Sequence, residues 1–264
     1  TSAELRLCHL SWSWGWRGFP MRLLVLGDSH SAYSFCGVKG AKIFWRGPVT
    51  MHRAARDGIA SLVPPNCIPA TGDVMVLSFG EIDCRVHIEK QAELKGRSAI
   101  QEADDLCDRF GSALNAFAKT CPAQLALACI VPFNPQFLEL TGRDLDRHIR
   151  QQSRIRDHVN ERLRRTGFPF VDFRSSFSNE DGTIIPSLSD RNFHINARKS
   201  QAVVDALNSA LGSNFKFSKP FLLPLDHAQP EKRLGFFKRM ERYVKIRRNA
   251  VLARLADILR WWRD

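Results

Sequence analysis

A short polar segment, GDSH at residues 27–30, carries the side chains of this sequence best placed to begin a chemical reaction. It follows the aliphatic run of residues 21–26, which is typical of a strand buried on both faces of a sheet. Open parallel sheets bind their ligands at the carboxyl ends of their strands. Ser29 could therefore point into such a crevice, beside backbone N–H groups of the following helix. The alternative is that Asp28 or Ser29 only caps that helix.

Three further polar segments are expected to lie near this serine. They have the sequences RGP (46–48), GEIDCR (80–85) and SDRNFH (189–194). The first two directly follow predicted strands, and the third precedes the last predicted helix. Because the carboxyl ends of parallel strands meet at one edge of a sheet, the four segments are predicted to share one site.

In this order, the four segments resemble the sequence blocks of the GDSL/SGNH hydrolase superfamily. That family has a serine nucleophile in a GDS block, a glycine after the second strand, a G-x-N-D block after the third, and a D-x-x-H block near the domain end. The similarity covers roughly residues 21–212. It implies a three-layer α/β/α sandwich whose parallel sheet has the flavodoxin-like strand order 2-1-3-4-5.

The resemblance also implies a role for individual residues. Ser29 would be the nucleophile, His194 its general base, and Asp190 the group that orients the imidazole. The backbone N–H groups of Ser29 and Gly47 would face the developing oxyanion. No metal and no cofactor would take part.

A second set of polar residues is predicted to contact the substrate. It comprises Asp28, His30, Glu81, Asp83 and Arg85. Each also has a structural interpretation: Asp28 could hold loops together, His30 could lie at a helix start, and Asp83 could form an ion pair with Arg85.

Two features depart from the family pattern. Alignment on Gly80 puts Ile82 where the family has an Asn that donates to the oxyanion, and loss of one such donor typically costs about a hundredfold or more in rate. Asp190 lies four residues before His194 instead of three, and Arg191 occupies the family's acid position.

The resemblance therefore implies a serine esterase that cleaves a small acyl group, most simply O-acetyl, from a carbohydrate or glycoconjugate. Two alternatives stay open. One is a binding or scaffold protein that has kept the fold and lost turnover, which the two departures favour. The other is a sugar O-acyltransferase that uses the same acyl-serine.

Strand-like and helix-like segments alternate along the chain. Strands are predicted at 21–27, 41–45, 73–79, 124–131 and 168–173, and helices after residue 50 and at 98–119, 143–165 and 197–211. Such alternation indicates an α/β fold, with a parallel sheet that is covered by helices on both faces.

The composition is that of an ordinary globular protein, with 44% hydrophobic and 25% charged residues in 264. No stretch approaches the roughly 18–20 apolar residues of a membrane span. Seven scattered cysteines without a C-x-x-C pair argue against a disulfide framework or a zinc site, and for a reducing compartment. We expect a cytoplasmic protein, with peripheral attachment to a membrane as an alternative.

Both ends of the sequence differ from the middle. Residues 1–20 are predicted to be an N-terminal extension, 21–214 the hydrolase-like domain, and 215–264 a connector and a basic amphipathic helix. The net charge is +12, and residues 231–264 hold eleven Lys or Arg against four Asp or Glu. An acidic protein or an anionic membrane surface is the expected partner of this helix. Nucleic acid is not expected, because no recognition module is present in the sequence.

Overall fold

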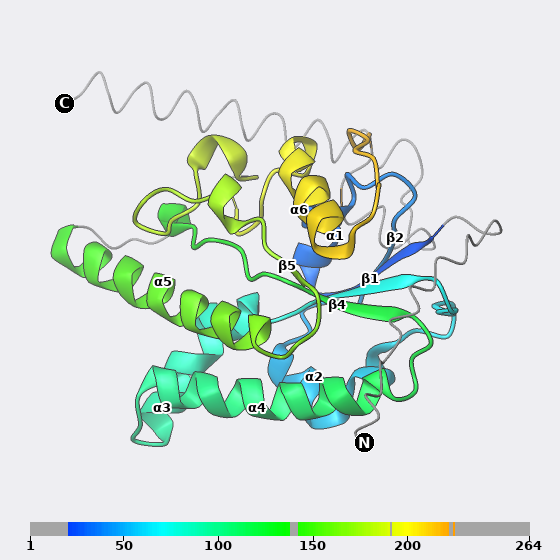
Figure 1. The fold of residues 1–264 in the computed structure, drawn as a ribbon. Helices are drawn as coiled ribbons and strands as arrows, with labels where there is room; N and C mark the ends of the chain where they lie inside the picture. The colour runs from blue at the N-terminus through cyan, green and yellow to red at the C-terminus, as the bar shows by residue number, and fades with distance from the viewer. Residues whose placement is uncertain (1–20, 138–141, 191, 222–223, 225–264) are drawn as a thin grey trace, which may run out of the picture.

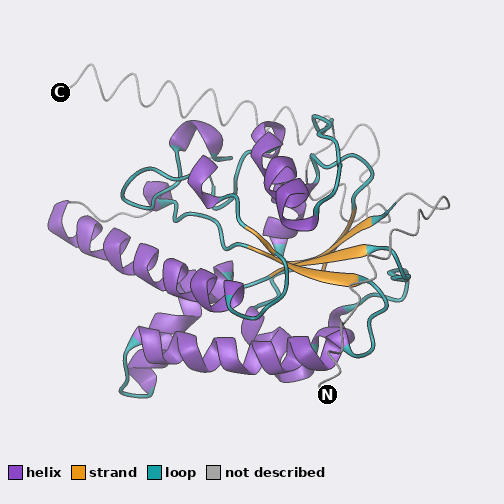
Figure 2. Cartoon of the chain, viewed as in Figure 1, coloured by secondary structure: helices purple, strands orange, loops and turns teal. Residues whose placement is uncertain are grey.

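The computed structural model describes residues 21–137, 142–190, 192–221 and 224. Within them, five strands form one sheet (Figure 2). The strands are β1 (Leu23–Gly27), β2 (Lys42–Trp45), β3 (Val74–Ser78), β4 (Gln124–Ala128) and β5 (Phe170–Val171). They pair in parallel in the order β2-β1-β3-β4-β5, which confirms the predicted sheet. The predicted helix at 231–263 and the extension at 1–20 lie outside the described residues.

Helices cover both faces of this sheet, so the predicted three-layer arrangement is confirmed (Figure 1). One face carries α1 (Ser29–Phe35) and α6 (Gln201–Leu211). The opposite face carries α2 (Met51–Asp57), α3 (Ile88–Leu94), α4 (Ala99–Ala118) and α5 (Gly142–Arg164). Among the described residues, no helix is long and apolar enough to cross a membrane.

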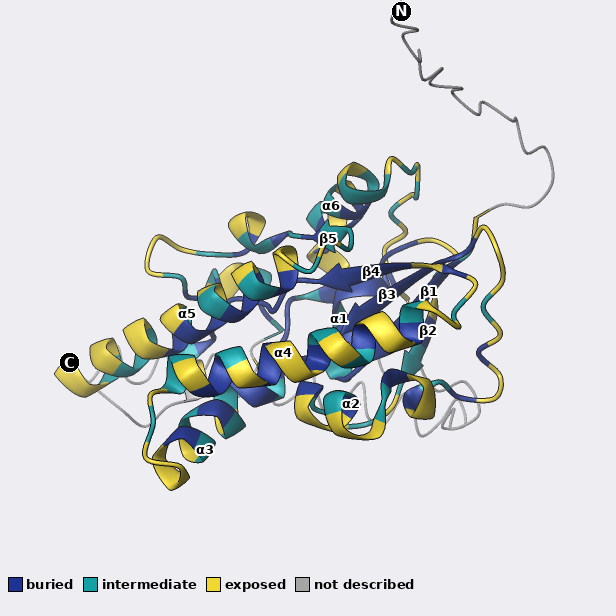
Figure 3. Cartoon of the chain, turned by 60° about the horizontal axis from the view of Figure 1, so that its bottom comes forward, coloured by how far each residue is buried: buried dark blue, intermediate teal, exposed yellow. Residues whose placement is uncertain are grey.

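Strand β1 shows why its sequence is aliphatic throughout. Successive side chains of a strand point to opposite faces, and here Leu24 and Leu26 join the cluster under α4, while Leu23 and Val25 join the cluster under α1 and α6. Each buried side chain of this size contributes about 1.5–3 kcal/mol. Strand β1 is therefore buried along its length, whereas the outer faces of α4 and α5 are exposed (Figure 3).

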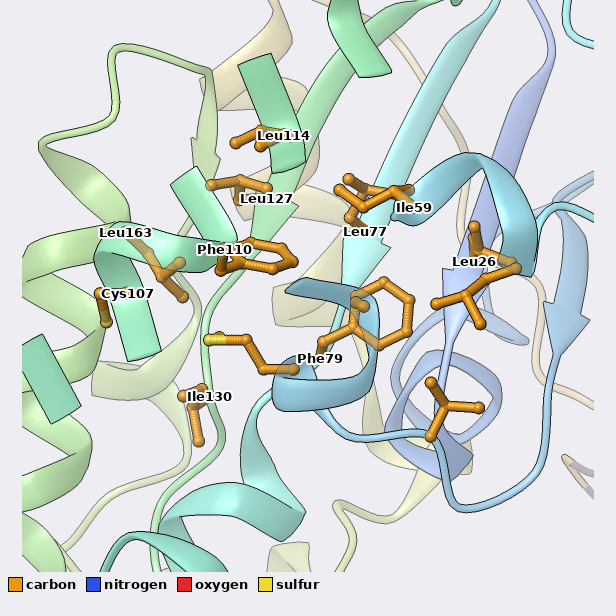
Figure 4. Close-up of a cluster of buried hydrophobic side chains, with 14 of the residues drawn as sticks. Leu26, Ile59, Leu77, Phe79, Cys107, Phe110, Leu114, Leu127, Ile130 and Leu163 are labelled. Atoms are coloured by element: carbon orange, nitrogen blue, oxygen red, sulfur yellow. The ribbon is translucent and has the colours of Figure 1, made fainter. Parts of the chain in front are cut away.

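The larger cluster fills the space between the sheet and the long helices. Leu77 of β3 and Leu127 of β4 face Phe110 and Leu114 of α4 (Figure 4). Phe79 meets Phe110 edge-on, with 6.3 Å between ring centroids, which is a favourable aromatic geometry. This packing holds the carboxyl ends of β1 and β3 in place. The polar segments 27–30 and 80–85 begin at these two strand ends.

Gly27 ends β1 where the chain passes unusually close to β3. A Cβ atom at this position would lie 2.1 Å from the backbone oxygen of Ser78. The Asp28 N–H donates to that same oxygen over 3.2 Å. A glycine is therefore required for the two strands to end side by side and bring their following segments together.

The structure differs from the prediction at several element ends. Strand β5 has only two residues, and it is an edge strand that pairs with β4 alone. A 3₁₀ turn at Ala197–Lys199 precedes α6, which begins at Gln201. Helix α3 and the π-helical turn Asp83–His87 before it were not predicted. These two segments are short, so neither repeats its apolar spacing often enough to be read from sequence.

Candidate active site

Ser29, His194 and Asp190 are in contact at one edge of the sheet, although 165 positions separate the serine from the histidine. Ser29 is the first residue of α1, directly after β1. Its Oγ lies 2.8 Å from His194 Nε2, and His194 Nδ1 lies 2.9 Å from an Asp190 carboxylate oxygen. With Nδ1–H donating to Asp190, Nε2 is left as an acceptor for the serine hydroxyl. Arg191, at the family's acid position, lies outside the described residues.

A tight loop accounts for the four-residue spacing between the acid and the histidine. Ser189 and Ile195 form an antiparallel bridge at its base. The Asp190 N–H donates to the His194 carbonyl over 2.9 Å, and one Asp190 oxygen accepts the N–H groups of Asn192 and His194 at 2.8 and 3.2 Å. The backbone thus folds back on itself, and the second Asp190 oxygen meets the imidazole.

Two rings of α1 hold the His194 imidazole in place. The Tyr33 ring stacks on it at 3.9 Å between centroids with an 8° angle, and the His30 ring lies at 4.7 Å and 48°. Only 11% of the His194 side chain is exposed. The imidazole therefore has little freedom to turn away from Ser29.

Glu81 and its partners form a buried layer beneath the site. The Glu81 carboxylate, 5% exposed, lies 3.4 Å from His30 Nε2, 3.0 Å from Arg85 Nε and 3.2 Å from an Arg156 terminal nitrogen. Burial alone would raise the pKa of Glu81, but the hydrogen bond with His30 and the positive charges of Arg156 and Arg85 outweigh it and lower the pKa. Burial lowers the pKa of His30. Glu81 is therefore a structural carboxylate that stays ionised.

Asp28 and Asp83 correct the prediction of substrate contact, because both are buried helix caps. Asp28 accepts the His30 N–H at 2.8 Å and so caps α1. Asp83 accepts the N–H groups of Met51 and His52 at the start of α2, over 2.6 and 3.2 Å. Each carboxyl is 1% exposed, and burial raises the pKa of both. Neither is placed to meet a substrate.

Arg85 is the predicted substrate-contacting residue that remains partly accessible, with 28% of its side chain exposed. It pairs with Glu81, so the expected alternative of an ion pair with Asp83 is wrong. Its guanidinium carbon lies 4.1 Å from the centroid of the Phe193 ring. A charged group thus stands beside the loop that carries His194.

The two predicted oxyanion donors are unoccupied. Within the described part of the chain, neither the Ser29 N–H nor the Gly47 N–H donates to a protein acceptor. Gly47 follows β2 with φ of 81°, a conformation that favours glycine. Ile82 has no side-chain donor to replace the family's Asn. The predicted oxyanion donors are thus backbone N–H groups, with no side-chain donor at position 82.

The described residues contain no group of three or more His, Cys, Asp or Glu side chains that could hold a metal ion.

Three residues that surround the site, Tyr33, Phe193 and Arg156, were not predicted from the sequence. Tyr33 lies one helical turn after Ser29, and this i, i+4 spacing is a signal that could have found it. Phe193 directly precedes His194, and no pattern indicated that its ring would meet Arg85. Arg156 contacts Glu81 from 75 positions away, and no local signal predicts that pairing.

Comparison with protein-family models gave no match, and neither did comparison with curated proteins. The chain is similar to several solved structures. One is Axe2, an acetylxylan esterase from Geobacillus stearothermophilus, with 15% identity over 75% of this chain and 96% of that chain and a TM-score of 0.47. Another is a member of the lipolytic protein G-D-S-L family from Veillonella parvula, with 12% identity over 74% and 100% and a TM-score of 0.46.

A third similar structure is LAE5, an alpha/beta hydrolase enzyme from the metagenome of Lake Arreo, with 15% identity over 73% of this chain and 95% of that chain and a TM-score of 0.43. Similarity at this level carries no information on what the present chain acts on. A proposal for the substrate therefore depends on the side chains around Ser29.

Proposed function

We propose that this protein is a serine esterase that cleaves a small acyl group, O-acetyl in the simplest case, from a carbohydrate or glycoconjugate. The observation that carries the proposal is the chain of contacts from Ser29 Oγ to His194 Nε2 at 2.8 Å and from His194 Nδ1 to Asp190 at 2.9 Å. A serine hydroxyl becomes a useful nucleophile when an oriented imidazole accepts its proton.

In this mechanism, the Ser29 oxygen attacks the acyl carbonyl carbon while its proton passes to His194 Nε2. The Asp190 carboxylate stabilises the imidazolium that forms. The N–H groups of Ser29 and Gly47 donate to the carbonyl oxygen as it becomes negative. The imidazolium then gives its proton to the leaving alcohol oxygen, and a water activated by the same imidazole hydrolyses the acyl-serine.

The surroundings of the site support a small acyl group and a hydroxylated substrate. Tyr33 and His30 leave little of the imidazole exposed, which favours a short acyl chain over a long one. The partly exposed guanidinium of Arg85 suits an alcohol with hydrogen-bonding groups better than a lipid chain.

Labelling with a fluorophosphonate probe, followed by mapping of the modified residue by mass spectrometry, tests the proposal. We expect modification at Ser29 that is lost in His194→Ala. The matched control is His158→Ala, because His158 also lies 2.8 Å from a carboxylate, that of Asp104. This control should label like the parent protein.

An absence of labelling in folded protein would contradict the proposal and favour the alternative of a binding or scaffold protein. If Ser29 is labelled, product analysis with an added sugar acceptor separates the esterase from the acyltransferase alternative. Free carboxylic acid is expected from the esterase, and acylated acceptor from the transferase.

A further inference from the structure

We propose that Arg85 selects leaving alcohols that carry an anionic group, a carboxylate or a phosphate, close to the scissile ester. This inference rests on the proposed esterase function and names the class of substrate within it. Acidic glycans that bear O-acyl groups are substrates of this kind.

The location of Arg85 relative to His194 carries the first part of the argument. The leaving alcohol must lie against His194 Nε2, because that nitrogen returns the proton to it. Phe193 directly precedes this histidine, and the Arg85 guanidinium lies over the Phe193 ring at 4.1 Å. Arg85 also reaches the imidazole through Glu81, which lies 3.4 Å from His30, whose ring lies 4.7 Å from that of His194. Arg85 therefore belongs to the contacts that surround the catalytic imidazole. Stacking on the aromatic ring also fixes the plane of the guanidinium.

The hydrogen-bonding state of Arg85 carries the second part. Its Nε donates to Glu81 at 3.0 and 3.2 Å. Its two terminal nitrogens have no acceptor within the part of the chain that the structure describes. With 28% of the side chain exposed, a ligand can reach them. A planar pair of such donors matches the two oxygens of a carboxylate or phosphate.

The charge on Arg85 is only partly balanced. Its carboxylate partner Glu81 also contacts the buried guanidinium of Arg156 at 3.2 Å, so one negative charge serves two arginines. Arg165 makes the same contact with a carboxylate four residues earlier, Glu161, which also contacts a second arginine, Arg164, but on the exposed end of α5. Arg165 is therefore a matched control for a test of Arg85.

The test compares two esters that differ only at C6, where one has a carboxylate and the other a neutral hydroxymethyl group: an O-acetylated methyl glucuronoside and the methyl glucoside acetylated at the same hydroxyl. We expect kcat/KM to be higher for the anionic ester by about tenfold, since hydrogen bonds between charged groups are about twice as strong as neutral ones. Arg85→Met should bring the ratio of the two esters toward one, mainly through KM. Arg85→Lys should give an intermediate ratio, and Arg165→Met should retain the parent ratio.

The acetylated 6-phosphate of the same glucoside distinguishes phosphate from carboxylate as the preferred group. A parent enzyme that hydrolyses charged and neutral esters equally would overturn the inference. So would a preference that persists in Arg85→Met. An equal loss on both esters in that variant would also overturn it, because Arg85 would then act on the acyl carbonyl shared by both.

Binding to the Ser29→Ala variant gives a readout that does not depend on turnover. Calorimetry with the same esters should show tighter binding of the anionic one, and the second substitution Arg85→Met should abolish this difference. If the parent protein hydrolyses neither ester while this difference is found, the proposed hydrolysis fails and the anion selectivity stands. Equal binding of both esters by Ser29→Ala would overturn the selectivity.

Discussion

Replacing Glu81 by Gln removes the one carboxylate that holds the buried layer beneath the site together. Among the described residues, Arg156, 3% exposed, would keep two uncharged partners, Gln152 and the Phe133 ring. Leaving one member of a buried ion pair without its partner costs about 3–5 kcal/mol. Because Gln keeps a hydrogen-bonding group, we expect a loss near the lower limit, about 3 kcal/mol. For a domain of this size that lowers Tm by about 6–12 °C.

Urea unfolding followed by circular dichroism measures this loss. Glu161→Gln is the control, because its partners Arg164 and Arg165 are both exposed and an exposed pair contributes at most about 1 kcal/mol. A double-mutant cycle with Arg156→Met should show that the two single losses together exceed the loss in the double variant by about 1–3 kcal/mol. If the loss in the double variant equals the sum of the two single losses, the pairing of Glu81 with Arg156 is refuted.

The pH dependence gives a second check. The pKa of Glu81 is lowered in the fold from its ordinary value of 4.5. A carboxyl with a lowered pKa stabilises the fold above its unfolded-state pKa, and this contribution is lost as the pH falls toward the folded-state pKa. The stability difference between the parent protein and Glu81→Gln should therefore be full at pH 7 and shrink below about pH 4.5. A difference that stays constant from pH 7 to pH 3 contradicts the reasoning.

Three other substitutions test the site and the strand ends. Asp190→Asn should lower esterase turnover by about 10²–10⁴-fold, because the imidazole loses its orienting charge; unchanged turnover of an acetyl ester would exclude this role. Burial raises the pKa of Asp28 above 3.8, so its ionised form destabilises the fold at neutral pH. Asp28→Asn should therefore raise Tm at pH 7 and give no gain near pH 3.5, and the reverse trend in thermal unfolding would count against it. Gly27→Ala forces a Cβ against the Ser78 oxygen and should cost about 1–3 kcal/mol or more in urea unfolding, whereas Gly111→Ala, with open space around it on α4, should be neutral or stabilising.

The sequence by itself determined most of the architecture. The aliphatic runs that became β1, β3 and β4 are buried on both faces. The apolar periodicity of α4 and the long charged run of α5 are also local in the chain. Such patterns persist whatever their neighbours are, because strand and helix geometry repeat every two or 3.6 residues. The alternation of elements then restricts the sheet to few topologies.

The sequence also singled out Ser29, Asp190 and His194, although their contact could not follow from spacing. The four-residue interval between Asp190 and His194 departs from the family pattern, and only the folded loop shows that backbone hydrogen bonds bring the acid to the imidazole. Loop conformation depends on a few specific hydrogen bonds, which no periodicity encodes.

Tertiary structure alone decided the roles of the acidic residues near the site. Asp83 caps α2 across 32 positions, and Glu81 meets Arg156 across 75. Neither pairing can be predicted from the local sequence. The same Asp or Glu residue can contact a substrate, a helix terminus or a buried guanidinium. Which of these it meets depends on how the helices pack against the sheet, and that packing is a property of the whole chain.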